Sequence, residues 1–198
     1  MGYYARNCVS LIIPQIYRCD TTKLFLDSQI LAYNEFLFLS GSVEILHLDF
    51  CGIYYNKNGT VGKNEDHRIV PLEKLVKTLV NLKQIAGDID PSHSYITKNT
   101  VKELLETPHF SKLYHFHFDR LPEVFDVDAI FAYLKYTKFC LHFAGTISEE
   151  YKVRIEKIVD EILQTETHDY KPPLITFDGL AAEKKRKMNC LYDHSSGL

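Results

Sequence analysis

Aspartate recurs at one fixed place in this sequence, directly after short stretches in which every second residue is apolar. Asp27, Asp49, Asp119 and Asp178 each end such a stretch, and in two of the four a histidine stands between the apolar residues. Carboxylates that repeat in one register can bind the positive charges of a basic peptide. The other interpretation is local, because aspartate commonly ends a strand and starts a turn. The two roles are compatible, and the sequence leaves both open.

Histidine and cysteine suggest two further kinds of chemistry. His115 and His117 would share one face of a strand, which suits two metal ligands, but no third ligand follows at a known metal spacing. Cys140 and His142 are also two residues apart, yet no nucleophile motif and no glycine-rich phosphate loop accompanies them. We therefore predict no metal, no cofactor and no catalytic residue, and we keep a small enzyme only as the second alternative.

The stretches that end in aspartate have the period of two that is typical of half-buried strands. One of them extends to Val43-x-x-Leu46-x-Leu48-x-x-Cys51, which fits the leucine-rich template L-x-x-L-x-L-x-x-N/C. Helical patterns separate the strands, which implies a parallel sheet with helices on one face. The predicted fold class is α/β, a leucine-rich-repeat-like arc, or solenoid. We expect its strands, in sequential order, near Leu24, Leu46, Ile85, Phe116, Leu141 and Ile175.

The same alternation predicts which side chains are buried and which face solvent. Leu46, Leu48, Phe116, Phe118, Leu141 and Phe143 are expected in the core, and Asp49 and Asp119 at the surface. Asp27, Asp49 and Asp119 should form a row about 4.8 Å apart where strands are adjacent, and this row should hold a basic segment of a protein partner. The predicted partner-binding face consists of Phe25, Asp27, His47, Asp49, Asp88, His117, Asp119, Cys140, His142, Thr176 and Asp178.

Net charge, the length of apolar runs and the spacing of cysteines limit the kinds of partner and the cellular compartment that we expect. The chain has 198 residues and a net charge of −3, which gives no attraction to nucleic acid. It lacks an apolar run long enough to span a membrane. Its five cysteines include no C-x-x-C pair, which favours reduced thiols and a cytoplasmic location.

We divide the chain into an N-terminal segment (1–15), a leucine-rich-like α/β domain (16–180) and a disordered polar tail (181–198). The tail carries a basic run that fits a nuclear import signal, with an ordinary solvated tail as the alternative. This run consists of Lys184, Lys185, Arg186 and Lys187.

Several phrases occur in an order that resembles a known family. They include Ile16-Tyr17-Arg18-Cys19-Asp20, Asn58-Gly59-Thr60 before Val70-Pro71-Leu72-Glu73-Lys74-Leu75, Pro108-His109-Phe110-Ser111-Lys112-Leu113, Leu121-Pro122-Glu123-Val124-Phe125-Asp126, and Leu141-His142-Phe143 before Ser148-Glu149-Glu150-Tyr151-Lys152. Together they resemble the nematode-expanded F-box-associated proteins, which have degenerate leucine-rich-like C-terminal regions.

The resemblance implies a role in a cullin-type ubiquitin ligase. In such proteins an N-terminal F-box docks on the ligase adaptor, and the region that resembles this chain recognises a partner or substrate. The fifteen residues before Ile16 are too few for an F-box, so we expect this chain to meet the adaptor only indirectly. Residues 61–68 look like an insertion relative to the family pattern. The first alternative is a stand-alone interaction protein with no ligase role.

Overall fold

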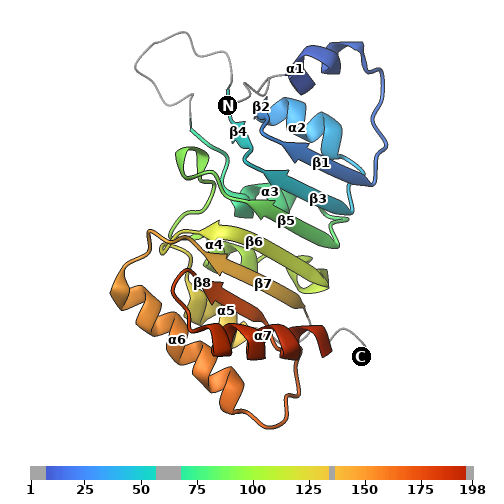
Figure 1. Cartoon of the computed structure of the whole chain (residues 1–198). Helices are drawn as coiled ribbons and strands as arrows, with labels where there is room; N and C mark the ends of the chain where they lie inside the picture. The colour runs from blue at the N-terminus through green and yellow to red at the C-terminus, as the bar shows by residue number, and fades with distance from the viewer. Residues whose placement is uncertain (1–7, 57–67, 134–136, 195–198) are drawn as a thin grey trace.

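Six strands form at the places that the alternating pattern predicts. The computed structural model describes residues 8–56, 68–133 and 137–194, so the 58–60 phrase and nearly all of the predicted insertion lie outside the described residues. The strands pair in parallel and in sequential order, which confirms the predicted sheet (Figure 1). They are β1 (Lys23–Asp27), β3 (Ile45–Asp49), β5 (Gln84–Asp88), β6 (His115–Leu121), β7 (Lys138–Phe143) and β8 (Leu174–Phe177).

Helices lie on both sides of this sheet, whereas the sequence predicted them on one side. Figure 1 shows α2 to α5 behind the strands and α7 in front of β7 and β8. A second, two-stranded parallel sheet pairs β2 (Ile30–Ala32) with β4 (Gly52–Tyr54). The helices are α1 (Cys8–Ile12), α2 (Tyr33–Ser40), α3 (Leu72–Thr78), α4 (Thr100–Leu105), α5 (Val127–Tyr133), α6 (Glu149–Gln164) and α7 (Ala182–His194).

The core is built from strand residues together with buried side chains of α2 to α6, and α7 adds Met188. Burial follows the predicted period of two in β1 and β3, because successive side chains of a strand point to opposite faces. In contrast, β5, β7 and β8 each bury three consecutive residues. All six strand residues predicted in the core have no exposed surface. Asp49 and Asp119, predicted at the surface, keep 40% and 45% of their side chains exposed.

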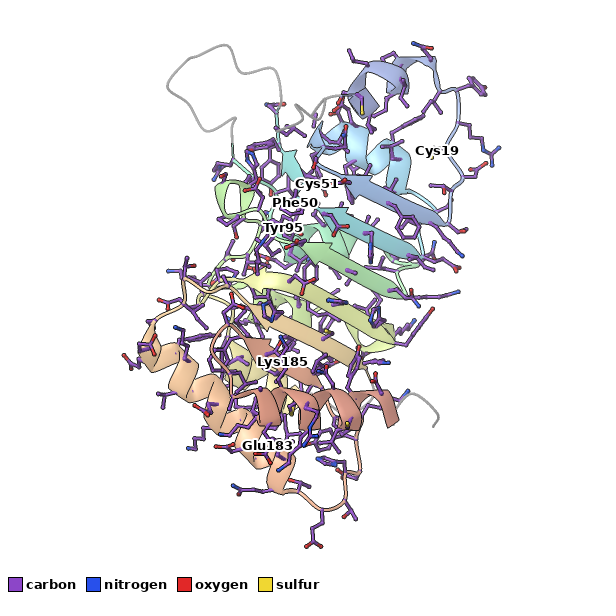
Figure 2. The ribbon with its side chains drawn as sticks, viewed as in Figure 1. Cys19, Phe50, Cys51, Tyr95, Glu183 and Lys185 are labelled. Atoms are coloured by element: carbon purple, nitrogen blue, oxygen red, sulfur yellow. The ribbon has the colours of Figure 1, made fainter. Side chains whose placement is uncertain are left out.

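The middle strand β5 has a glycine where its neighbours carry large core residues. Gly87 pairs with Leu48 on one side and Phe118 on the other. The fully buried Tyr95 packs beneath it, and the Tyr95 hydroxyl donates to the Leu48 carbonyl oxygen at 3.4 Å (Figure 2). A Cβ atom at Gly87 would lie 2.5 Å from that carbonyl oxygen and 2.9 Å from the hydroxyl. Only glycine leaves room for Tyr95 here.

The same unusual backbone conformation follows the aspartate in three strands, at the ends of β1 and β3 and within β6. Ser28, Phe50 and Arg120, each directly after an aspartate of the pattern, have φ angles of 55°, 52° and 54°. Such left-handed conformations are uncommon outside glycine. The N–H groups of Ser28 and Phe50 donate to the carbonyl oxygens of Asp49 and Asp88 on the next strand. At β1 and β3 the turns thus extend the ladder by one residue before the chain enters β2 and β4.

The prediction of a disordered tail is wrong for residues 182–194, because these residues form α7. Met188 has no exposed surface and joins the hydrophobic core. The Lys184 ammonium lies 2.7 Å from a Glu156 oxygen and 2.6 Å from an Asp160 oxygen, both on α6. One buried side chain and a bridge between two helices therefore order a segment whose composition is mostly polar.

Candidate partner-binding face

The face of the sheet opposite α2 to α5 carries two rows of side chains that cross the strands. We call this surface the open face. The first row runs through Phe25, His47, Ala86, His117 and Cys140, which are register partners on successive strands. The second row runs through Asp27, Asp49, Asp88 and Asp119. The structure thus brings together, in the predicted register, the sequence-predicted site residues of the first four strands.

The row of carboxylates contains its own cation. The Arg120 Nη2 atom lies 2.7 Å from Asp88 Oδ1, and both atoms are buried. The Arg120 guanidinium also lies 4.2 Å from the centre of the Phe50 ring, and its Nε donates to the Ile89 carbonyl oxygen at 2.9 Å. Burial raises the pKa of Asp88, and the arginine opposes that rise. Arg120 therefore stabilises carboxylates that would otherwise repel one another across adjacent strands.

His117 and Asp119 form a charged pair next to this cation. The His117 Nε2 atom lies 3.3 Å from Asp119 Oδ2. Hydrogen bonds with Asp119 and then with Cys140 raise the pKa of His117 to about 10. The bond with His117 lowers the pKa of Asp119 in turn. Both shifts favour the charged forms, so the pair is an imidazolium and a carboxylate at neutral pH.

The other predicted histidines lie farther from their carboxylates. His47 Nδ1 is 3.9 Å from Asp49 Oδ2, and His142 Nε2 is 3.7 Å from Asp178 Oδ1. The other ring nitrogen of His142 hydrogen bonds with Thr176 Oγ1 at 2.8 Å. Neither ring lies as close to its carboxylate as the His117 ring, whose nitrogen is 3.3 Å from Asp119.

Helix α7 covers the end of the open face at β7 and β8. Cys140 and Thr176, both predicted as partner-binding residues, are only 9% and 5% exposed, which contradicts a place on an accessible surface. The Tyr192 ring of α7 lies 4.1 Å from the Lys138 ammonium, on the side of β7 that carries Cys140. Asp178, beyond the end of β8, remains exposed. The accessible part of the face therefore ends near β6.

Sequence reasoning did not predict three residues of this surface. Phe50 is 41% exposed and directly follows Asp49. An apolar residue at that position was the one feature of the sequence that could have placed Phe50 on this surface. Arg120 stands in the same place after Asp119, beside a register shift in β6 that no local pattern reveals. Tyr192 lay within the segment predicted to be disordered.

Metal ligands and surface grooves are the remaining features of the described residues. Across the part of the chain that the structure describes, no three His, Cys, Asp or Glu side chains gather as metal ligands. His115 and His117 have ring centres 6.0 Å apart, and burial lowers the pKa of His115. A groove of about 710 Å³ lies between α3 and α4, far from the open face, and its described lining has amines and carboxylates but no Cys, Ser or His.

Comparison with known protein families, with curated proteins and with solved structures finds no match for this chain. The resemblance to F-box-associated proteins therefore remains a hypothesis that rests on the sequence phrases alone. Among the helices that the structure describes, none combines the length and the apolar character needed to cross a bilayer.

Proposed function

We propose that this chain is a protein-interaction module whose open face recognises a partner protein. The single observation that supports this most is the register of the two side-chain rows, which offers aromatic rings and carboxylates at repeated spacings. Such a surface can bind an extended peptide through many similar contacts. The −3 net charge and the carboxylate row favour a partner with a basic segment.

The finer fold that we propose is a leucine-rich-like arc of strand–helix units. Cys51 supports it, since this residue stands at the Asn/Cys position of the template. Its Sγ atom lies 3.3 Å from the carbonyl oxygen of Leu26, in the preceding unit, and donates to it. Burial raises the pKa of Cys51 to about 12, which keeps the thiol protonated and able to donate. One unit is thereby tied to the next, as a stacked repeat requires.

The ligase connection that we propose rests on the family resemblance. Under this hypothesis the chain recognises a partner or substrate and meets the ubiquitin-ligase adaptor only through other components. The proposed compartment is the reducing cytosol, because the five cysteines are widely spaced and include no C-x-x-C pair. The nuclear import alternative requires α7 to release Lys184 from Glu156 and Asp160.

A quantitative affinity purification tests the function. The tagged full chain would be compared with a face variant, Phe25→Ala with His47→Ala, and with a control variant, Lys74→Ala with Lys77→Ala. The control residues are exposed on α3, on the opposite side of the sheet. We expect a partner that is lost with the face variant and kept with the control.

Retention of every partner by the face variant would refute the proposed binding surface. Adaptor and cullin subunits among the face-dependent partners would support the ligase role. Face-dependent partners without those subunits would instead favour the stand-alone interaction protein.

A further inference from the structure

Aromatic rings and carboxylates concentrate at one end of the open face. Phe25 is 62% exposed, which is unusual for a phenylalanine on a sheet, and its ring packs edge-on against His47 with centres 5.3 Å apart. Asp27 and Asp49 follow two residues later in the same register. With Phe50 these residues form a surface that we call the Phe25–Phe50 patch, defined as Phe25, Asp27, His47, Asp49 and Phe50.

The same face shows how it holds an arginine. Arg120 places its guanidinium over the Phe50 ring at 4.2 Å while it pairs with Asp88 at 2.7 Å. Its Nε hydrogen bonds with a carbonyl oxygen at the end of β5. Ring, carboxylate and strand-end carbonyl together satisfy the flat, multiply donating guanidinium.

The other residues of the open face already have partners or are covered. Asp88 is engaged by Arg120, and Asp119 is engaged by His117. Beyond β6, α7 covers Cys140. Within the patch the Phe50 ring already carries Arg120, so the exposed Phe25 ring is the one left for a ligand. Beside it lie Asp27 and Asp49, for which the structure shows no arginine or lysine partner within the described residues.

We propose that the Phe25–Phe50 patch binds an arginine side chain of the partner, in the ring-and-carboxylate manner of Arg120. This inference rests on the proposed function and adds the chemical identity of the bound group. Arginine is preferred to lysine because a planar guanidinium can stack on a phenyl ring and donate to two carboxylate oxygens together, whereas an ammonium is a compact and strongly hydrated charge.

Two short peptides provide the test: acetyl-Gly-Arg-Gly-Arg-Gly-amide and its lysine analogue. Each would be titrated into the full chain at low and high salt while amide shifts are followed by NMR. We expect shifts confined to residues 23–28 and 45–50, weak binding that falls with salt, and an affinity about threefold or more higher for the arginine peptide.

Variants of the patch locate the contacts. Phe25→Leu keeps apolar volume but removes the ring, and Asp27→Asn removes a charge at nearly constant shape, so both should fold. Each is expected to weaken the arginine peptide about threefold. Phe38→Leu on α2, behind the sheet, and Glu150→Gln on α6 are matched controls at exposed positions outside the open face, and they should leave binding unchanged.

Equal affinity for the two peptides would overturn the arginine assignment, and shifts on another surface would overturn the location. Neither result bears on whether a whole partner needs the open face, which the affinity purification decides. Conversely, arginine-selective binding at the patch would stand even if that purification revealed no face-dependent partner.

Discussion

The two ends of the open face are built from the same strand pattern but differ in what lies over them. At β1, Phe25 and Asp27 are exposed to solvent, and their neighbours on β3, His47 and Asp49, are partly exposed. At β7 and β8, the equivalent surface is covered by α7, and Cys140 and Thr176 are buried. The alternating pattern therefore determines which side of a strand a residue occupies. Whether that side is accessible to solvent depends on a segment that is distant in the sequence.

The largest expected effect concerns the residue that anchors α7. Met188→Ala removes a fully buried side chain and should lower the free energy of unfolding by about 2–5 kcal/mol. Phe25→Ala, at the uncovered end, should change it by no more than about 0.5 kcal/mol. Urea unfolding of the two variants makes the measurement. Equal costs would remove the distinction between the two ends.

A somewhat smaller effect is expected at Gly87, in the strand between the two ends. Gly87→Ala forces a Cβ atom against the Leu48 carbonyl oxygen and the Tyr95 hydroxyl, and should destabilise by about 1–3 kcal/mol. Gln84→Ala, at a less buried position on the opposite face of β5, serves as the control and should cost less. A neutral Gly87→Ala variant would contradict the close packing of Tyr95 beneath β5.

The reaction rates of the cysteines test how accessible the two ends of the molecule are to solvent. Cys8 and Cys190 are exposed and should react quickly with iodoacetamide, while Cys51 and Cys140 should react slowly. Tyr192→Ala thins the cover over β7 and should speed the modification of Cys140 several-fold, with Cys51 unchanged. Mass spectrometry of the modified peptides reads each site separately. Fast modification of Cys140 in the unaltered chain would show that α7 does not cover it.

The smallest expected effect on stability comes from the pair of His117 with Asp119, because both side chains are more than a third exposed and water screens their attraction. This effect depends on pH. The folded pKa of His117, about 10, exceeds the ordinary value of 6.5, so its contribution to stability is complete below that ordinary value and is lost as pH rises through about 10. His117→Gln should remove this loss, whereas His47→Gln should retain it. Unfolding curves at pH 6 and pH 9.5 measure the difference. A similar slope in His117→Gln and in the unaltered chain would contradict the strong pair with Asp119.

Sequence reasoning located the strands because burial on one side of a sheet leaves a local signature. Leu46 and Leu48 are separated by the outward His47, and this alternation needs no knowledge of distant contacts. The carboxylate row followed from it, since parallel strands with the same phrase align the same positions.

Local alternation could not predict that α7 covers one end of the open face or that Arg120 pairs with the carboxylate row. In α7, Met188, Leu191 and Tyr192 have helical spacing, but the charged run before them dominates the composition. Arg120 reaches Asp88 and Phe50 only because β6 is irregular between Phe118 and Leu121. Both features depend on contacts between segments, which local periodicity does not report.

The sequential order of the strands has a consequence for local unfolding. Within the described residues, each strand of the main sheet hydrogen bonds only with strands adjacent to it in that order, so an end strand can separate while the other ladders remain intact. Amide hydrogen exchange should then proceed inward from the ends rather than in one global event. Because α7 holds β8 in place, β1 would open more often, and transient fraying would begin at the same end that presents Phe25 and Asp27.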